Sequence, residues 1–502
     1  MKRMLLTVAM ALAMTAPSFA ESYAPTICPA PAECRISATD YSPMKSVVIE
    51  TSVGAEAQEW ASSHLRLWYG EHAPEIRMKR FRGDMAPDAY TLDITGGEVR
   101  IAASTLGGVR NALHSLRQIA IPSRGTMTVQ GWSVPEAEVR DSPAMAFRGV
   151  HLCWFPETEA ADIERMIRLA AYYKLNYVVI ESWGTFRSDV APWFGWPAGK
   201  MTKEELKRLR DIAGDLGVCL IPQLNVFGHA SGSRIRSGKH AVLDFAPQYQ
   251  PLFEPEGGWN WCLSNPETLK LQLALISEML DAFGNPPFFH IGCDEAEAPS
   301  CPDCIVVPYH ELVVTHLTAI SDYLKSKGSR AMMWHDMLLE RGDQRWKGFY
   351  ANGTEYTAKA LEGLPRDIVI CDWFYGPVAD SYPTLDFFNT QGFDVLSCPW
   401  DNIQGIRAQG RYASSAGLFG VLGTTWHHAY GTKLAEIFSQ LAEACWNRDP
   451  KLSTSGYNSM LLRVATHLRQ IGWDMKQTEY RHTGWYDYQV ITEPDADRTL
   501  AP

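Results

Sequence analysis

The feature that most constrains the fold is a regular alternation, from Ala146 to Thr425, of short apolar, β-branched runs with longer segments of helical periodicity. The segments 158–174, 202–217 and 266–284 repeat apolar residues every three or four positions. Parallel strands joined by helices produce this alternation, which predicts a (β/α)8 TIM barrel. The rival, a doubly wound open sheet, carries a Gly-x-Gly-x-x-Gly loop after its first strand, and that loop is absent. The strand candidates are 146–152, 176–181, 218–224, 287–292, 330–335, 367–373, 393–398 and 419–425.

The chain of 502 residues is longer than one ordinary domain, so we expect a second domain. The segment before the barrel has the pattern of a smaller α+β unit. Its predicted strands are 45–50, 90–95 and 98–104, and its predicted helices are 55–70 and 106–119. We find no acid–base constellation there and interpret it as a packing domain. The predicted organisation is a signal peptide at 1–20, a linker at 21–43, an N-terminal α/β domain at 44–142, the catalytic barrel at 143–446, and a C-terminal helix and tail at 447–502.

The N-terminus has the pattern of a secretory signal peptide. Lys2 and Arg3 precede a short apolar run, and the small residues Ser18 and Ala20 suit cleavage near Ala20. The run is too short to span a bilayer, and no later segment offers about 18 unbroken apolar residues. We therefore expect a soluble, secreted or periplasmic protein. The formal net charge of −11 disfavours nucleic acid and anionic membrane surfaces as partners.

The cysteine count bears on the predicted export, because disulfides form in oxidising compartments. There are 11 cysteines, an odd number, so at least one thiol has no partner within the chain. Cys301 and Cys304 lie in a Cys-Pro-Asp-Cys motif with three open interpretations: a local disulfide, half of a metal site, or two free thiols. Zinc requires further ligands at regular spacing, and the sequence shows none, so we predict no metal site.

Nearly every predicted barrel strand ends in aromatic or ionisable residues, and chemistry in such barrels lies at the carboxyl ends of the strands. Aromatic platforms with a few acids are typical of a sugar pocket. Asp294 and Glu295 follow the fourth strand, and we expect their mutual repulsion to keep one carboxyl protonated near neutral pH, as glycoside hydrolysis requires. The strand-end residues are Arg148, His151, Glu181, Trp183, Asn225, His229, His290, Asp294, Glu295, Trp334, Asp336, Trp373, Tyr375, Trp400 and Trp426.

The sequence His-Ile-Gly-Cys-Asp-Glu at 290–295 resembles the His-x-Gly-x-Asp-Glu signature of family 20 glycoside hydrolases, the β-N-acetylhexosaminidases. The cysteine in this motif is similar to that of the hexosaminidase D-like branch. Further similarity lies at 147–152, at 217–230, and in the aromatic motifs of the later strands. The small domain in front also looks like the usual N-terminal companion of the family.

This resemblance implies an exo-acting β-N-acetylhexosaminidase with substrate-assisted retaining catalysis. Its substrate is a carbohydrate with a terminal N-acetylhexosamine, and it needs no cofactor. Glu295 is then the general acid and later the base, and Asp294 orients the 2-acetamido group. The implied substrate-binding residues are Arg148, His229, Trp334, Trp373, Tyr375, Trp426 and Glu181, with His290 as support behind the acids.

The chain also departs from the family pattern. The segment at 181–187 replaces the long second-strand signature, Asn225 stands where the family has an acid, and His428 replaces a glutamate. These changes concern the residues that contact sugar hydroxyls, and they leave Asp294 and Glu295 intact.

Two alternatives stay open at this point. Glu181 is either a salt-bridge partner of Arg148 or Arg187, a sugar ligand, or the carboxylate nucleophile of an ordinary retaining glycosidase. The other alternative is a non-catalytic carbohydrate-binding homologue, which the altered loops favour and the intact acid pair disfavours.

Overall fold

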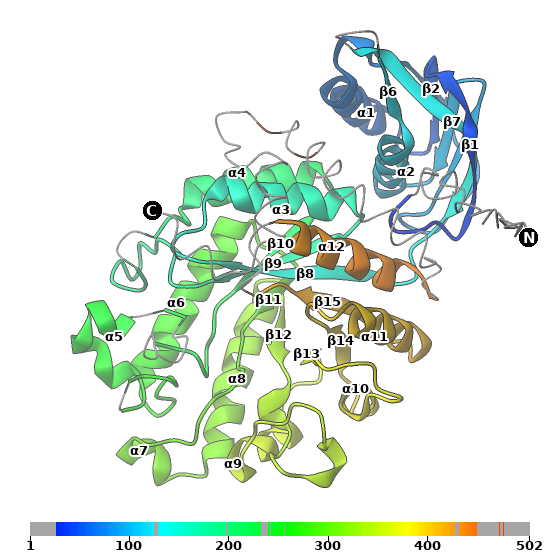
Figure 1. The fold of residues 1–502 in the computed structure, drawn as a ribbon. Helices are drawn as coiled ribbons and strands as arrows, with labels where there is room; N and C mark the ends of the chain where they lie inside the picture. The colour runs from blue at the N-terminus through cyan, green and yellow to red at the C-terminus, as the bar shows by residue number, and fades with distance from the viewer. Residues whose placement is uncertain are drawn as a thin grey trace, which may run out of the picture.

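The computed structural model describes residues 27–448 except 125–128, 197–198, 232–238, 241, 256 and 427–430, together with Ile471 and Met475. The predicted signal peptide and nearly all of the predicted C-terminal segment lie outside these residues. The described chain forms a small sheet domain beside a larger barrel (Figure 1). Among the helices described, none is long and apolar enough to cross a membrane.

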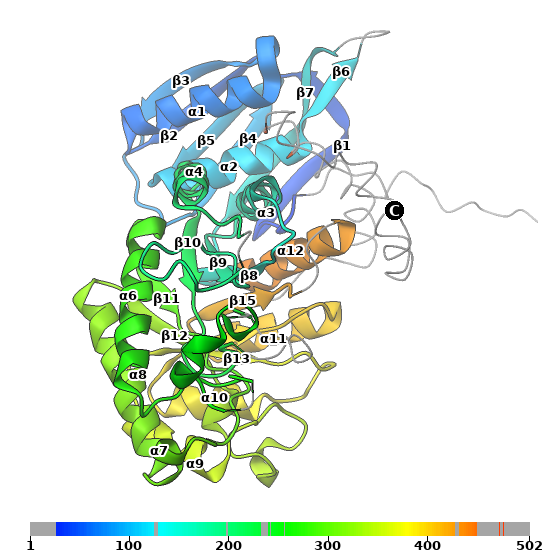
Figure 2. The same ribbon diagram turned by 90° about the vertical axis from the view of Figure 1, so that its left-hand side faces the viewer.

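The small domain is a mixed sheet with two helices on one face (Figure 2). The strand order is β1-β7-β4-β5-β2-β3, with β6 paired to β7, and only the β2–β3 and β2–β5 pairs are parallel. The helices bury Trp60, Leu65 and Leu113 against the sheet, which gives this domain its own core. Its elements are β1 (Glu33–Pro43), β2 (Ser46–Thr51), α1 (Gly54–Tyr69), β3 (Glu75–Arg80), β4 (Tyr90–Thr95), β5 (Glu98–Ala103), α2 (Leu106–Ile119), β6 (Ile121–Arg124) and β7 (Val129–Asp141).

The linker predicted at 21–43 is wrong for about its last half. Residues Glu33–Pro43 form strand β1, which pairs antiparallel with β7 at the edge of the sheet. Most β1 side chains are exposed or half-buried, so the strand lacks the apolar alternation that identifies strands in a sequence. Edge strand β3 was missed for the same reason, since its six residues are mostly charged and exposed.

The second domain is a closed barrel of eight parallel strands in the order β8 to β15, as predicted. All eight strand candidates in this part of the sequence are barrel strands. Side chains such as Phe147, Val179, Met332 and Leu422 fill the interior, so a site in this domain lies at a mouth of the barrel. The strands are β8 (Phe147–Trp154), β9 (Tyr177–Ser182), β10 (Cys219–Gln223), β11 (Phe288–His290), β12 (Arg330–Trp334), β13 (Val369–Trp373), β14 (Asp394–Cys398) and β15 (Gly420–Thr424).

The surrounding helices begin at residues that cap them. Thr202 accepts a hydrogen bond from the Glu205 N–H at the start of α4, and Asn265 accepts one from the Glu267 N–H at the start of α6. Helix α6 ends at Gly284 in the left-handed conformation, where glycine has no steric penalty. The main helices are α3 (Ala160–Tyr172), α4 (Lys203–Asp215), α6 (Pro266–Phe283), α8 (Tyr309–Ser326), α10 (Pro383–Thr390), α11 (Ile403–Ser415) and α12 (Gly431–Trp446), with short turns at α5 (Val242–Phe245), α7 (Pro302–Ile305) and α9 (Glu355–Ala358).

The small domain lies next to α3 and α12 (Figures 1 and 2), and buried polar contacts join the two domains there. The Lys174 ammonium lies 2.8 Å from the Tyr90 hydroxyl and 3.3 Å from Oδ2 of Asp141. The Trp446 indole donates to Oδ1 of Asp141 at 2.8 Å, and Gln118 donates to the Tyr172 carbonyl at 3.0 Å. Because these groups are buried and hydrogen-bonded, the domains pack as one unit at this contact.

Candidate active site

The acid pair lies in a tight turn that follows strand β11. Gly292, Cys293 and Glu295 all have positive φ angles, of 67°, 81° and 48°. A side chain at Gly292 would lie 2.5 Å from atoms of Asn225, so only glycine fits there. Positive φ at non-glycine residues is strained, and such residues cluster at functional sites. The turn gives the adjacent acids different surroundings: Asp294 is buried, whereas half of the Glu295 side chain is exposed.

Asp294 is surrounded by donors. Its Oδ1 accepts a hydrogen bond from Asn225 at 3.1 Å, and its Oδ2 lies 3.2 Å from the Lys239 ammonium and 3.3 Å from Nε2 of His229. These contacts compensate the charge of a buried carboxylate, which would otherwise be costly. They also orient Asp294 toward the cavity.

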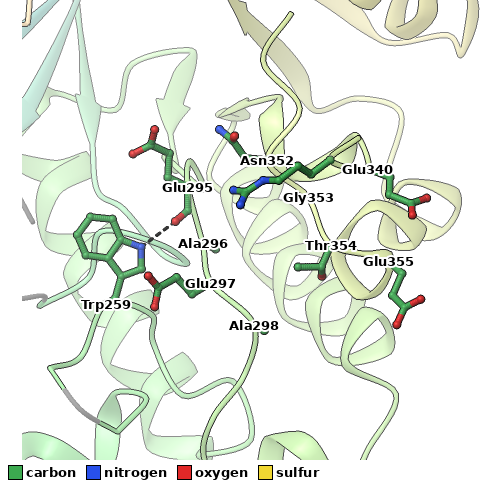
Figure 3. Close-up of a pocket in the computed structure, with 11 residues that line it drawn as sticks. Trp259, Glu295, Ala296, Glu297, Ala298, Glu340, Asn352, Gly353, Thr354 and Glu355 are labelled. Carbon is green, nitrogen blue, oxygen red and sulfur yellow. Dashed lines mark hydrogen bonds between the residues drawn. The ribbon is translucent and has the colours of Figure 1, made fainter. Parts of the chain in front are cut away.

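Glu295 is held by its backbone and contacted by one histidine. Its N–H donates to Oδ2 of Asp336 at 3.0 Å, and its Oε2 lies 3.2 Å from Nε2 of His229. Its carbonyl accepts from the Trp259 indole at 2.7 Å (Figure 3). The hydrogen bond from His229 lowers the pKa of Glu295, against the opposing effect of burial. The lowered pKa of Glu295 runs against the expectation that repulsion keeps one carboxyl of the pair protonated near neutral pH.

The carboxyl with the raised pKa in this group is Asp336 instead. Burial, helped by the charge of Asp294, raises the pKa of Asp336 to about 6. Its Oδ2 accepts from Glu295 and from Asn352, and its Oδ1 accepts from the Trp373 indole at 3.2 Å. Asp336 thus connects the backbone of Glu295 to an aromatic wall of the site.

A cavity of about 490 Å³ opens at the carboxyl ends of the barrel strands, next to both acids. Its floor contains Trp334, which is fully buried, and the Trp426 indole donates to the Tyr375 hydroxyl at 2.8 Å on one wall. Aromatic faces with a few polar groups suit a sugar ring with an apolar substituent. The lining residues are Phe155, Trp183, His229, Lys239, Asp294, Glu295, Trp334, Trp373, Tyr375, Trp400 and Trp426.

Seven of the predicted site residues line this cavity. They are Asp294, Glu295, His229, Trp334, Trp373, Tyr375 and Trp426. His290 lies behind the cavity, where its Nδ1 accepts from the Gly292 N–H at 3.1 Å and its ring contacts Trp334 at 4.5 Å. Burial lowers the pKa of His290 well below its ordinary value, so the ring supports the acid turn in its neutral form.

Lys239 is a site residue that the sequence did not indicate. Its ammonium is 2% exposed, lies 2.7 Å from Oε1 of Glu181 and sits over the rings of Trp183 and Trp426. It comes from the long loop between β10 and α6, where no periodicity marks it. Phe155 was also missed, because strand β8, which it directly follows, extends two residues beyond the predicted strand at 146–152.

Glu181 does not line the cavity, so its prediction as a substrate-binding residue is wrong. Its side chain is 1% exposed and lies beneath Lys239. It accepts hydrogen bonds from Gln223 at 2.6 Å and Trp183 at 2.9 Å. Although burial opposes ionisation, the charge of Lys239 and a hydrogen bond from His151 lower the pKa of Glu181 well below its ordinary value. A buried, fully paired carboxylate is poorly placed to act as a nucleophile.

The prediction that Arg148 holds the ring hydroxyls of a sugar is also wrong. Its side chain points to the domain contact, donating to the carbonyls of Met145 and Lys174 and to Oδ2 of Asp88 at 2.8 Å. It also lies over the ring of Trp446. Arg148 lies near the start of β8, and side chains at that end of a barrel serve stability instead of chemistry.

A second cavity, of about 580 Å³, adjoins the first at Glu295 (Figure 3). Trp259 and Glu297 line one side of it, and Glu340, Asn352 and Thr354 line the other. Glu295 borders both cavities, so its carboxyl can reach a bond that crosses from one to the other.

Two groups of described residues have the types and spacing of metal ligands. His151, Cys153 and Glu181 form one, but Lys239 already supplies the cationic partner of Glu181 there. The other group, Glu254, Cys262, Cys301 and Cys304, lies away from the acid pair cavity.

Comparison with known families agrees with this arrangement. Residues 24–142 match the family model described as glycosyl hydrolase family 20, domain 2, and residues 184–373 match the one described as glycosyl hydrolase family 20, catalytic domain. The chain belongs to glycosyl hydrolase family 20. The second match contains the acid turn and the floor of the cavity, so the family assignment and the geometry refer to the same residues. The comparisons do not separate branches within family 20, and the hexosaminidase D-like branch stays a prediction.

Among related proteins, a lacto-N-biosidase of Bifidobacterium bifidum is 24% identical over 280 residues, covering 51% of this chain and 23% of the relative. A β-hexosaminidase of Akkermansia muciniphila is 25% identical, covering 43% and 48%, and one of Vibrio furnissii is 22% identical, covering 70% and 59%. The chain thus spans less than two thirds of the length of each of these three relatives.

Solved structures of family 20 share the fold. The exo-β-N-acetylglucosaminidase of Vibrio harveyi, solved with N-acetylglucosamine, superposes with a TM-score of 0.69 at 18% identity, covering 93% of this chain and 79% of that one. The N-acetyl-β-hexosaminidase of Streptomyces plicatus superposes with a TM-score of 0.64 at 17% identity, covering 92% and 98%.

Proposed function

We propose that this family 20 glycoside hydrolase is an exo-acting β-N-acetylhexosaminidase. The observation that carries the proposal is the position of Asp294 and Glu295 at the edge of a tryptophan-walled cavity. The buried indole of Trp334 closes the floor, and the filled barrel interior lies beneath it. A blind pocket admits the end of a glycan chain and excludes its middle, which favours exo action.

In the proposed reaction the 2-acetamido group of the substrate is the nucleophile. Its carbonyl oxygen attacks the anomeric carbon while the glycosidic bond breaks, and Glu295 donates a proton to the leaving oxygen. Asp294 accepts a hydrogen bond from the acetamido N–H and offsets the positive charge of the oxazolinium ion. Water then attacks the anomeric carbon, Glu295 takes its proton, and the acetamido group is restored with the sugar configuration retained.

The second cavity suits the leaving group, because it begins at Glu295 and is lined by groups that bind hydroxyls, such as Asn352 and Thr354. Proton transfer then occurs at the boundary between the two cavities. The Tyr375 hydroxyl, which accepts from the Trp426 indole, is the proposed donor to the acetamido oxygen.

The alternative with Glu181 as nucleophile is disfavoured, because Glu181 is buried under Lys239. The two mechanisms make different demands on the substrate. Substrate-assisted catalysis requires the acetamido group, so the protein should cleave an aryl β-N-acetylglucosaminide and leave the aryl β-glucoside intact. Covalent labelling of Glu181 by a fluorinated glycoside would overturn the proposal.

The decisive variant is Glu295→Gln, which keeps the shape of the side chain and removes the transferable proton. We expect turnover of the aryl β-N-acetylglucosaminide to fall by at least about a thousandfold, near the range of lost acid–base catalysis. A thiazoline mimic of the oxazolinium ion should still bind. The matched control is Glu311→Gln on the exposed face of α8, which should keep full activity. Binding of the glycan without hydrolysis by the wild-type chain would instead support a non-catalytic binding protein.

We also propose that the chain is exported, on the basis of the basic, apolar and small-residue pattern of its first twenty residues. Expression in a bacterial host followed by N-terminal sequencing tests this. Mature protein that begins at or near Glu21 supports export, and recovery of the intact N-terminus from the cytoplasm contradicts it.

A further inference from the structure

Cys262 meets Cys301 and Cys304, which follow 39 and 42 positions later in the sequence, in one buried cluster. The Cys262 sulfur lies 3.6 Å from the Cys301 sulfur and 3.8 Å from the Cys304 sulfur. A disulfide requires about 2.05 Å, and none of the 11 cysteines is in a disulfide. Tetrahedral zinc with Zn–S bonds of about 2.3 Å separates two sulfur ligands by about 3.8 Å. The observed separations therefore match thiolates that share a metal ion.

Glu254 supplies a fourth ligand atom to this cluster. Its Oε2 accepts hydrogen bonds from the N–H groups of Ser300 and Cys301, at 2.7 and 2.6 Å, and from the Ser300 hydroxyl. Its Oε1 is buried and has no hydrogen-bond partner. The ligand atoms of all four residues lie within 4.8 Å of one another. A carboxylate oxygen buried without a partner is costly, and a cation at this point would satisfy it.

We propose that Cys262, Cys301, Cys304 and Oε1 of Glu254 bind one structural zinc ion. Three thiolates are soft ligands that favour zinc over calcium or magnesium. All four residues are buried, which fits a closed four-coordinate site with no position for substrate. As zinc binds, the thiols lose their protons to solvent, so binding releases up to three protons per ion.

The geometry of the two loops supports this assignment. Glu254 and Cys262 flank a short hairpin in the loop between β10 and α6, where the Glu254 N–H donates to the Asn260 carbonyl. Cys301 and Cys304 lie at α7 in the loop between β11 and α8, and the Cys304 N–H donates to the Cys301 sulfur at 3.2 Å. Hydrogen bonds to sulfur of this kind stabilise a thiolate. The zinc would therefore cross-link two loops of the barrel mouth.

The cross-linked loops are the ones that hold the acid pair in place. Trp259, three residues before Cys262, donates to the Glu295 carbonyl at 2.7 Å. Asn260 exchanges two hydrogen bonds with the backbone of Glu297, at 2.7 and 3.0 Å. Zinc thus acts as a positioning element for Glu295. This kinetic consequence rests on the proposed function, whereas zinc binding itself does not.

The test measures zinc in the purified full-length chain by elemental mass spectrometry. We expect one zinc ion per chain in the wild type, and less than about a tenth of that in Cys301→Ser and in Cys304→Ser. The matched control is Cys219→Ser, a half-buried cysteine of β10 outside the cluster, which should keep its zinc. Cobalt in place of zinc should give a thiolate charge-transfer band that both cluster variants lose.

Because the cluster variants can fail to fold, a second measurement uses only the wild type. Titration of its thiols with an organomercurial, in the presence of a zinc-sensitive dye, should release one zinc ion as three thiols react. Chelation should lower the melting temperature, and zinc, but not magnesium, should restore it. Metal-free folded protein with three free cluster thiols, or a disulfide between two of them in non-reducing peptide mapping, would overturn the proposal.

Failure of this inference is distinguishable from failure of the proposed function. Hydrolysis of the aryl glycoside by a protein that contains no zinc would contradict only the proposed metal site. One zinc ion in a protein without hydrolytic activity would support the metal site and contradict the proposed function.

Discussion

The ammonium of Lys239 lies between two buried carboxylates, 2.7 Å from Glu181 and 3.2 Å from Asp294. This arrangement neutralises part of the negative charge beneath the candidate sugar pocket. It also connects the buried floor of the site to the acid that is proposed to orient the acetamido group. Both carboxylates raise the pKa of Lys239 despite its burial, so the cation persists throughout the accessible pH range.

Lys239→Met should therefore leave two buried carboxylates facing each other without a cation. Breaking a buried ion pair on one side costs about 3–5 kcal/mol, and we expect a loss of this size in the free energy of unfolding from chemical denaturation. We also expect kcat/KM for the aryl β-N-acetylglucosaminide to fall by more than tenfold.

The double variant Lys239→Met/Glu181→Gln provides the control for this prediction. It removes the charge of Glu181, one of the two buried carboxylates left without a cation, so it should recover much of the stability lost in the single variant. If Lys239→Met alone is as stable as the wild type, the ion pairs of Lys239 do not stabilise the fold, and this prediction is wrong.

The fold and the acid pair were predictable because their signals are local. Barrel strands are buried on both faces, so each appears as a short apolar run, and Asp294 and Glu295 follow one of these runs directly. The edge strands β1 and β3 gave no such signal, since most of their side chains are exposed.

The contacts that involve long loops were not predictable in the same way. Lys239 reaches Glu181 across 58 positions of sequence, and Cys262 meets Cys301 across 39. No local periodicity encodes such pairs. Arg148 shows a different kind of error. Its strand was predicted correctly, but its side chain points toward the domain contact at the amino end of the barrel and not toward the cavity at the carboxyl end. The strand pattern predicts which side chains face the same side of a strand. It does not predict the direction along the strand in which a side chain as long as that of arginine extends.

Arg148→Met tests this corrected position. Arg148 donates to Met145, Lys174 and Asp88 in the buried domain contact, so its loss should lower the free energy of unfolding by about 3 kcal/mol. KM for the aryl substrate should stay within about twofold, because the side chain lies outside the cavity. A large rise in KM with unchanged stability would restore the original prediction that Arg148 binds sugar.

His229→Gln should change the pH dependence of activity. The hydrogen bond from His229 lowers the pKa of Glu295, and the general acid acts only in its protonated form. Without His229 the pKa of Glu295 rises, so the alkaline limb of the kcat/KM profile should move to higher pH. In the wild type, kcat/KM should already decrease with rising pH within the acidic range. An unshifted alkaline limb in the variant would mean that another group controls it.

Asp372→Asn tests the stability effect of a second buried acid. Burial, with a further contribution from the charge of Asp336, raises the pKa of Asp372 to about 8, against about 3.9 for an unfolded aspartate. His335 gives no charge to compensate it, because burial lowers the pKa of that ring to about 3. The folded state thus binds an extra proton between about pH 4 and pH 8, and the stability that this proton provides is lost as the pH rises through that window.

The slope from this one group is at most about 1.4 kcal/mol per pH unit, and the asparagine variant should lack it. Melting temperatures measured between pH 4 and pH 8 should therefore fall less steeply in Asp372→Asn than in the wild type, and the variant should be the more stable of the two near pH 8. Asp336, whose pKa is raised to about 6, contributes a slope of the same kind in both proteins, over the narrower window between about pH 4 and pH 6. The exposed Asp322 of α8 offers the control, since Asp322→Asn should keep the wild-type slope. Parallel curves for Asp372→Asn and the wild type would show that Asp372 is ionised in the folded protein.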